Sequence, residues 1–119
     1  MPVLVINTNV PQAKVTQDLV KKLVDVVADS LSKPKNYVVV QVIGGQAMSW
    51  GGGDAACAAG RLTSIGAINR SNNDKLQSGV AHLLKQELAI SSDHLYITFE
   101  DVAPVNIGWK QGTFADIFG

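Results

Sequence analysis

The sequence predicts an α/β fold, classed as α+β in some schemes, in which two β-α-β units form a four-stranded mixed sheet with two helices on one face. Short β-branched runs alternate with two longer stretches whose apolar residues recur at helical spacing. The same order of elements occurs twice, at about residues 2–60 and 61–119, and Leu31 with Ile90 and Tyr37 with Tyr96 occupy similar places. A helix after each first strand favours parallel pairing within a unit by a right-handed crossover.

The first unit begins with a short apolar strand at residues 3–6. From Thr16 to Leu31, apolar residues fall on one side of an amphipathic helix and charged residues on the other. Pro34 ends this helix because proline cannot continue the hydrogen-bond ladder. A second apolar strand follows at residues 37–43 and completes the unit.

The second unit repeats this plan with a strand at residues 62–65 and a strand at residues 95–99. Between them, residues 71–74 resemble a capping box before a helix that extends to Leu88. The tail from residue 104 to residue 119 has no helical period but is rich in aromatic residues. We expect these rings to pack on a neighbour or to line a pocket.

The composition predicts one compact domain over residues 1–119. A hydrophobic content of 46% supplies enough apolar material for a core. The helices can cover only one face of the sheet, whereas strands such as residues 38–40 are apolar on both faces. We therefore expect a homo-oligomer that covers the bare face.

Charge and length exclude several kinds of partner. Ten basic and ten acidic residues leave no net charge, which argues against nucleic acid or an anionic membrane surface as partners. No stretch approaches the roughly 20 apolar residues that membrane insertion requires. The start of the chain does not match a secretory signal. The expected location is the cytoplasm, and secretion by a route without a signal peptide would leave no mark in the sequence.

The sequence suggests neither a disulfide nor a metal site. Cys57 is the single cysteine, so no intrachain disulfide can form. His82 and His94 have no cysteine or carboxylate at ligand spacing, so we expect no metal.

Pro2 is a candidate general base. An initiator methionine before proline is normally removed, which would leave Pro2 with a free secondary amine at the start of a strand. An α-amino group has a pKa of roughly 7.7–8.0, and burial or a nearby cation lowers it. A neutral amine can accept a proton. On the Met-Pro dipeptide alone, a trimmed start without a role is the simpler interpretation.

Short motifs along nearly the whole chain carry a family resemblance. They are Met1-Pro2, Asn7–Pro11, Lys33-Pro34 with Tyr37, Ser64–Gly66, Gly108-Trp109 and Thr113-Phe114. In this order and spacing the chain resembles the family of migration inhibitory factor and D-dopachrome tautomerase. The resemblance implies a homotrimer and a cofactor-free keto-enol tautomerase. Its substrate would be a small aromatic 2-oxo acid or enol of the phenylpyruvate or dopachrome type.

The resemblance also implies roles for individual residues. Pro2 would be the catalytic base, Lys33 would pair with the substrate carboxylate, and Ser64 and Ile65 would line the pocket floor. The other implied substrate contacts are Tyr37, Tyr96, Thr98, Ile107, Trp109 and Phe114, with Tyr96 supplied by a neighbouring subunit. Taken alone, Lys33 would be interpreted as a lysine that favours the helix dipole, Ile65 as core and each aromatic residue as packing.

Several positions depart from the mammalian pattern of the family. Thr98 replaces a frequent asparagine and Thr63 a frequent histidine, which bears on substrate preference. Gly60 removes the second cysteine of the redox motif, so thiol-disulfide activity is not expected. Residues 116–119 extend past the usual end. The alternative function is that of a secreted cytokine-like ligand for a cell-surface receptor, in which the pocket has no physiological substrate.

Overall fold

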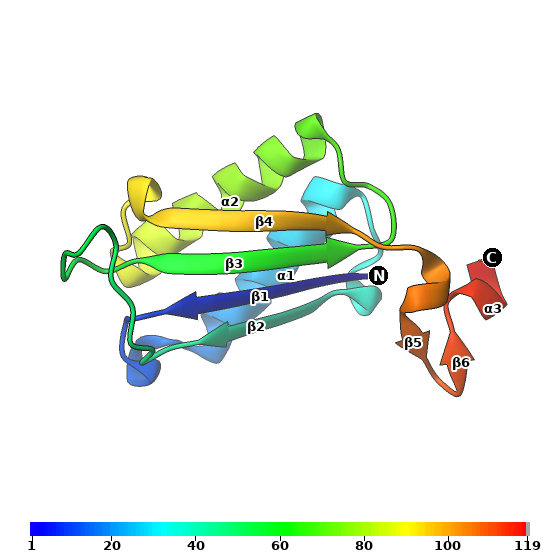
Figure 1. The fold of residues 1–119 in the computed structure, drawn as a ribbon, viewed down its shortest axis with the longest axis horizontal. Helices are drawn as coiled ribbons and strands as arrows, with labels where there is room; N and C mark the ends of the chain where they lie inside the picture. The colour runs from blue at the N-terminus through cyan, green and yellow to red at the C-terminus, as the bar shows by residue number, and fades with distance from the viewer. Residues whose placement is uncertain (119) are drawn as a thin grey trace.

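Residues 1–118, which the computed structural model describes, form a four-stranded sheet and a small C-terminal ribbon (Figure 1). The strands of the sheet are β1 (Pro2–Thr8), β2 (Val39–Ile43), β3 (Ala58–Ser64) and β4 (Leu95–Asp101), and they lie in the order β2-β1-β3-β4. β1 is parallel to β2 and β3 is parallel to β4, whereas β1 and β3 are antiparallel. The predicted mixed sheet of two β-α-β units is confirmed.

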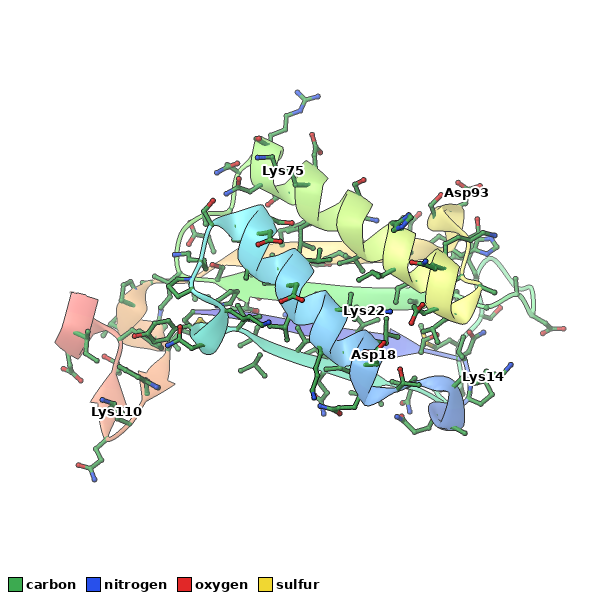
Figure 2. All side chains as sticks on the ribbon, turned by 180° about the vertical axis from the view of Figure 1, so that it is seen from behind. Lys14, Asp18, Lys22, Lys75, Asp93 and Lys110 are labelled. Carbon is green, nitrogen blue, oxygen red and sulfur yellow. The ribbon has the colours of Figure 1, made fainter. Side chains whose placement is uncertain are left out.

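The helices α1 (Gln17–Leu31) and α2 (Arg70–Leu88) lie side by side on one face of the sheet (Figure 2). At the start of α1, the Thr16 hydroxyl accepts a hydrogen bond from the Leu19 N–H at 3.1 Å, as an N-cap does. Ser32 then reverses the chain in the left-handed conformation, with φ 53°. In residues 1–118, no helix combines the length and apolar character needed to cross a bilayer.

The core lies between the helices and the sheet. Side chains alternate along β1, so that Leu4 and Ile6 are fully buried while their neighbours face the open side. Leu62 from β3, Leu23 from α1 and many other leucine and valine residues complete one cluster. Burying these side chains is the main stabilising contribution to the fold.

The structure corrects two details of the predicted second unit. The helix begins at Arg70, because the Asn69 side chain accepts from the Asn72 N–H at 2.9 Å. Residues 71–74 lie inside the first turn and are not the cap. Leu88 ends α2 as Leu31 ends α1, so Ile90 is not the counterpart of Leu31.

Short 3-10 turns explain where two strands begin. Residues Lys35–Tyr37 and Ser92–His94 form 3-10 turns before β2 and β4. Tyr37 therefore lies in a turn rather than in the predicted strand, and Tyr96 lies within β4. A further 3-10 turn spans Gln12–Lys14.

The tail contains structure that its lack of a period did not predict. A 3-10 turn at Pro104–Asn106 leads into β5 (Gly108–Trp109) and β6 (Gly112–Thr113), which pair as an antiparallel ribbon. The short helix α3 (Ala115–Phe118) follows. α3 is too short to show a helical period, which is why the sequence of the tail gave no sign of it.

The face of the sheet opposite the helices is apolar over only part of its area. Val39 of β2 is 55% exposed there, and Val3 and Val5 of β1 are partly exposed. On β3 and β4 the same face carries the exposed ion pair of Arg61 and Glu100, with an N–O distance of 3.3 Å. The prediction that the strands are apolar on both faces therefore holds for β1 and β2 and is wrong for β3 and β4.

Replacing Leu23 by alanine should destabilise the fold by about 2–5 kcal/mol, because a fully buried leucine leaves a cavity in the core. Chemical denaturation of the purified protein measures this change. Lys21→Ala, on the exposed side of the same helix, is the matched control and should leave the unfolding midpoint nearly unchanged. Equal effects of the two variants would contradict the described packing of α1.

Candidate active site

A cavity of about 440 Å³ opens at the end of the sheet where β1 begins. It is lined by residues from four separate segments of the chain. These residues are Met1, Lys33, Pro34, Tyr37, Ile65 and Phe114. Fold topology alone brings them together, because the turn after α1, the end of β3 and the tail all meet at this edge.

Pro2 lies beside this cavity as the first residue of β1. It is fully buried and pairs with Ser64 across the antiparallel β1–β3 ladder. The residue before it is held by the same ladder, because the Ile65 N–H donates to the Met1 carbonyl at 3.4 Å. In this structure Met1 therefore covers the Pro2 nitrogen and occupies the Ile65 N–H.

The pKa of the Met1 α-amino group shows how the surroundings affect a charge at this end of the cavity. Its pKa lies below the ordinary value, first because the group is partly buried and second because the Lys33 ammonium is nearby. Both causes disfavour the protonated amine. A nitrogen at this edge of the cavity is thus shifted towards the neutral form that accepts protons.

Lys33 reaches into the cavity from the end of α1. Its Nζ donates a hydrogen bond to the Ile65 carbonyl at 3.0 Å, so its side chain does not cap the carbonyls of its own helix. In the part of the chain that the structure describes, Lys33 forms no ion pair with a carboxylate. Its charge is therefore available to an anionic ligand.

Tyr37 and Phe114 form an apolar wall on one side of the cavity, and Trp109, which is not among the lining residues, packs against both rings. Trp109 and Phe114 stack with centroids 5.1 Å apart and planes 11° apart. Tyr37 meets both rings edge-on, at 5.7 Å from Trp109 and 6.2 Å from Phe114. Phe114 is 3% exposed, and its N–H donates to the Ile107 carbonyl at 3.0 Å. Ile107 thus contributes its backbone to this wall.

The floor of the cavity is fixed by backbone hydrogen bonds around Ser64. The Ser64 carbonyl accepts from the Val102 N–H at 2.9 Å, and the Asp101 carboxylate accepts from the Gly66 N–H at 2.9 Å. These bonds hold Ile65 in place. The Ser64 hydroxyl is buried without a hydrogen-bond partner among the described residues. Sequence reasoning missed Pro34 in the lining and Asp101 in the support, although Asp101 lies only two residues after the end of the predicted strand.

The structure does not bring Tyr96 and Thr98 to this cavity. Both lie on the open face of β4, and Tyr96 pairs with Ala59, which is five residues along β3 from Ser64. At about 3.3 Å per residue, that separation is roughly 17 Å. Tyr96 is 71% exposed and packs against Trp50 with centroids 4.5 Å apart. Only a second copy of the chain can place these two residues near such a cavity.

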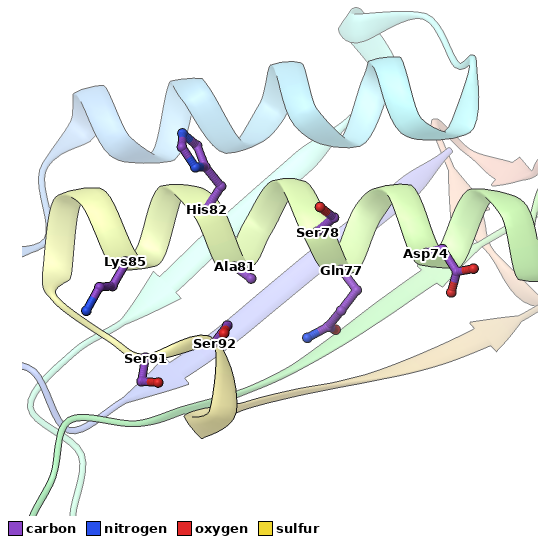
Figure 3. A pocket seen from close by; sticks show the side chains of 8 residues that line it. All are labelled: Asp74, Gln77, Ser78, Ala81, His82, Lys85, Ser91 and Ser92. Carbon is purple, nitrogen blue, oxygen red and sulfur yellow. The ribbon is translucent and has the colours of Figure 1, made fainter.

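A second hollow, a groove of about 560 Å³ along α2, is a weaker candidate (Figure 3). Seven of its eight lining residues are polar or charged, and Figure 3 shows His82 pointing away from Ser91 and Lys85. Residues 1–118 contain no cluster of three or more histidine, cysteine or acidic side chains suited to a metal ion. Chemically, the cavity at Pro2 is the better site.

A mixed sheet of two β-α-β units, with a proline opening a central strand, defines the class of proteins with the tautomerase fold. The family model of macrophage migration inhibitory factor (MIF) matches residues 1–115. The chain belongs to the macrophage migration inhibitory factor family.

Individual relatives agree with this assignment. Macrophage migration inhibitory factor of Mus musculus is 36% identical over 115 residues, which cover 97% of this chain and 100% of the relative. The homolog of Brugia malayi is 38% identical over 114 residues, with 96% and 99% covered. The solved structure of the factor from Trichinella spiralis matches with a TM-score of 0.88 at 32% identity, covering 94% of this chain and 99% of that one.

Replacing Lys33 by methionine should raise the pKa of the chain's terminal amine, because a cation that disfavours protonation is removed. The rise should stop short of the ordinary value, since burial is the larger cause and remains. Titration of the isotopically labelled amine by NMR measures the shift. Lys35→Met is the matched control, because Lys35 pairs with Asp25 on the exposed surface at 2.8 Å. A pKa that does not change in the Lys33 variant would contradict this electrostatic account.

Proposed function

We propose that this protein is a cofactor-free keto-enol tautomerase of a small aromatic 2-oxo acid, with Pro2 as the general base after removal of Met1. The observation that carries the proposal is the position of buried Pro2, directly after Met1 and paired with Ser64, beside a cavity lined by Lys33 and Ile65. A base, a cation and a hydrogen-bond donor then surround one cavity. This arrangement suits the transfer of a proton on a carboxylate-bearing substrate.

The proposed reaction moves one proton without a change of oxidation state. The neutral Pro2 nitrogen takes a proton from C3 of the 2-oxo acid, and the electrons of the broken C–H bond form the C=C bond of the enolate. The carbonyl π electrons move to the oxygen, and the protonated Pro2 nitrogen then gives its proton to that oxygen, which yields the enol and restores the neutral amine. The Lys33 ammonium stabilises the negative charge of the bound anion.

Removal of Met1 has a second consequence for substrate binding. The Ile65 N–H, which donates to the Met1 carbonyl, loses its acceptor. This N–H, in a partly buried residue at the cavity, would then be open to a new acceptor oxygen. We assign that acceptor to the substrate carboxylate, with Lys33 as its counter-charge.

The aromatic wall supports an aromatic rather than a short aliphatic substrate. Tyr37, Phe114 and Trp109 offer ring faces and edges against which a phenyl or indole group can pack. Phenylpyruvate-like and dopachrome-like compounds combine such a ring with a carboxylate. In the proposed complex, Ser64 and Ile107 support the floor and the wall.

We further propose that three chains assemble and that each site receives Tyr96 and Thr98 from a neighbour. The support is the bare sheet face, with Val39 55% exposed and Tyr96 71% exposed. Exposed apolar side chains on one face mark a contact surface. The exchange of Tyr96 between subunits would close the otherwise open cavity.

Analytical ultracentrifugation at micromolar concentration should give about three times the chain mass of 12.6 kDa. Val39→Asp should shift the distribution towards smaller species, because it places a charge on the exposed apolar part of β2. Val39→Ile, which preserves the apolar surface, is the control. A folded wild-type protein that sediments as a monomer would contradict both the trimer and the shared site.

Insertion of one alanine between Met1 and Pro2 should abolish tautomerisation of phenylpyruvate while leaving the fold intact. The new terminal amine lies about one residue, or 3.3 Å, from the original position. A misplacement of 1 Å can cost about 100-fold in rate, so a larger loss is expected. Circular dichroism and sedimentation serve as controls for the fold, and mass spectrometry of the wild type should show Met1 missing. Wild-type turnover by the insertion variant would disprove Pro2 as the base.

The relatives are named as macrophage migration inhibitory factors, and we propose as a second candidate role that of a secreted ligand for a cell-surface receptor. A receptor surface needs no cavity and no neutral amine. The cavity, the lowered pKa of the terminal amine and the position of Lys33 all favour the enzymatic role. Signalling that persists in the alanine-insertion variant would show that the ligand role is separate from catalysis.

A further inference from the structure

Asp116 closes a capping box that joins the C-terminal ribbon to α3. The Thr113 hydroxyl accepts from the Ala115 N–H at 3.2 Å, and the Asp116 carboxylate accepts from the Thr113 N–H at 2.7 Å. The two side chains thus satisfy backbone donors reciprocally, as the sequence pattern Thr-x-x-Asp predicts. The second bond is charge-assisted and is the shorter of the two.

The ribbon that this box fixes would be weak on its own. β5 and β6 contribute two residues each, and isolated hairpins are marginal even when longer. Lys110 in the turn adopts φ 54°, a left-handed conformation that costs a non-glycine residue energy. Asp116 also packs directly on Gly112, where a Cβ atom would overlap its carboxylate. The ribbon therefore depends on contacts from α3.

The residue inside the capping box belongs to the aromatic wall. Phe114 lies between Thr113 and Ala115, lines the cavity and stacks on Trp109 of β5. The Ile117 N–H donates to the Phe114 carbonyl at 3.1 Å, so α3 holds the same residue from the other side. Lys110 places its Nζ 4.5 Å from the centre of the Trp109 ring. Fixing residues 113–116 therefore fixes the ring of Phe114 and, through the stacking contact, that of Trp109.

Asp116 also lies just beyond the part of the chain that the family shares. The match to the family model ends at residue 115, one residue before Asp116, the acidic member of the capping box. We propose that Asp116 is a positioning residue that holds the Trp109–Phe114 wall and so sets the preference for aromatic substrates. This inference rests on the proposed function for its substrate.

Steady-state kinetics of Asp116→Ala tests the inference with phenylpyruvate and with an aliphatic 2-oxo acid of similar length. We expect KM for the aromatic substrate to rise about three- to tenfold with kcat nearly unchanged. The lost charge-assisted hydrogen bond should weaken binding of the aromatic ring without moving the catalytic base. KM for the aliphatic acid should stay the same. A chain ending at Ala115 should show the same pattern, Asp116→Glu should restore wild-type values, and Ile117→Ala is the matched control within α3.

Unchanged KM values in Asp116→Ala, or equal losses on both substrates, would overturn the inference. A measurement without turnover separates it from the proposed function. Calorimetry with unreactive 3-phenylpropanoate should show weaker binding to Asp116→Ala than to wild type, and amide exchange at Thr113 should be faster. If the wild type binds this ligand but does not tautomerise phenylpyruvate, the proposed function fails and the binding comparison still decides the role of Asp116.

Discussion

The pairing of Pro2 with Ser64 at the end of the β1–β3 ladder is the constraint on which the candidate site depends. It holds the start of the chain at the cavity, because β1 is a central strand with neighbours on both sides. The same ladder presents both backbone groups of Ile65, its N–H to Met1 and its carbonyl to Lys33. A strand at the sheet edge would hold a terminal nitrogen less firmly. The chemistry proposed for Pro2 is therefore a property of its place in the sheet.

The residues around the cavity would combine substrate binding with control of the proposed base. Tyr37 and Phe114 line the cavity together with Met1, and partial burial is the larger cause of the lowered pKa of the Met1 α-amino group. Lys33 adds a positive charge that disfavours a second cation and attracts a carboxylate. In the proposed complex, an aromatic 2-oxo acid would meet an apolar wall, a cation and a neutral amine in one cavity. All of the residues in this proposed site have positions that the fold itself determines.

The long elements were predictable because their apolar residues follow a clear period, as in α1 and β1. The structure of the tail was not predictable, because α3 is too short for its residues to show a helical period. The spacing of Thr113 and Asp116 nevertheless marks the cap of α3. Motifs resembling a known family indicated Lys33 as a site residue. Its bond to Ile65 depends on the left-handed turn at Ser32, which no local propensity predicts. The distance of Tyr96 from the cavity follows from strand register, which the sequence pattern left undetermined.

The most direct test of the central claim compares two titrations of the same protein. One is the NMR titration of the Pro2 nitrogen in the protein without Met1, and the other is the pH dependence of kcat/KM for phenylpyruvate. Because the neutral amine is the active form, kcat/KM should rise with pH as Pro2 loses its proton. The account predicts one shared pKa below the ordinary α-amino range of roughly 7.7–8.0. A kinetic pKa that differs from that of Pro2, or a rate independent of the protonation of Pro2, would contradict it.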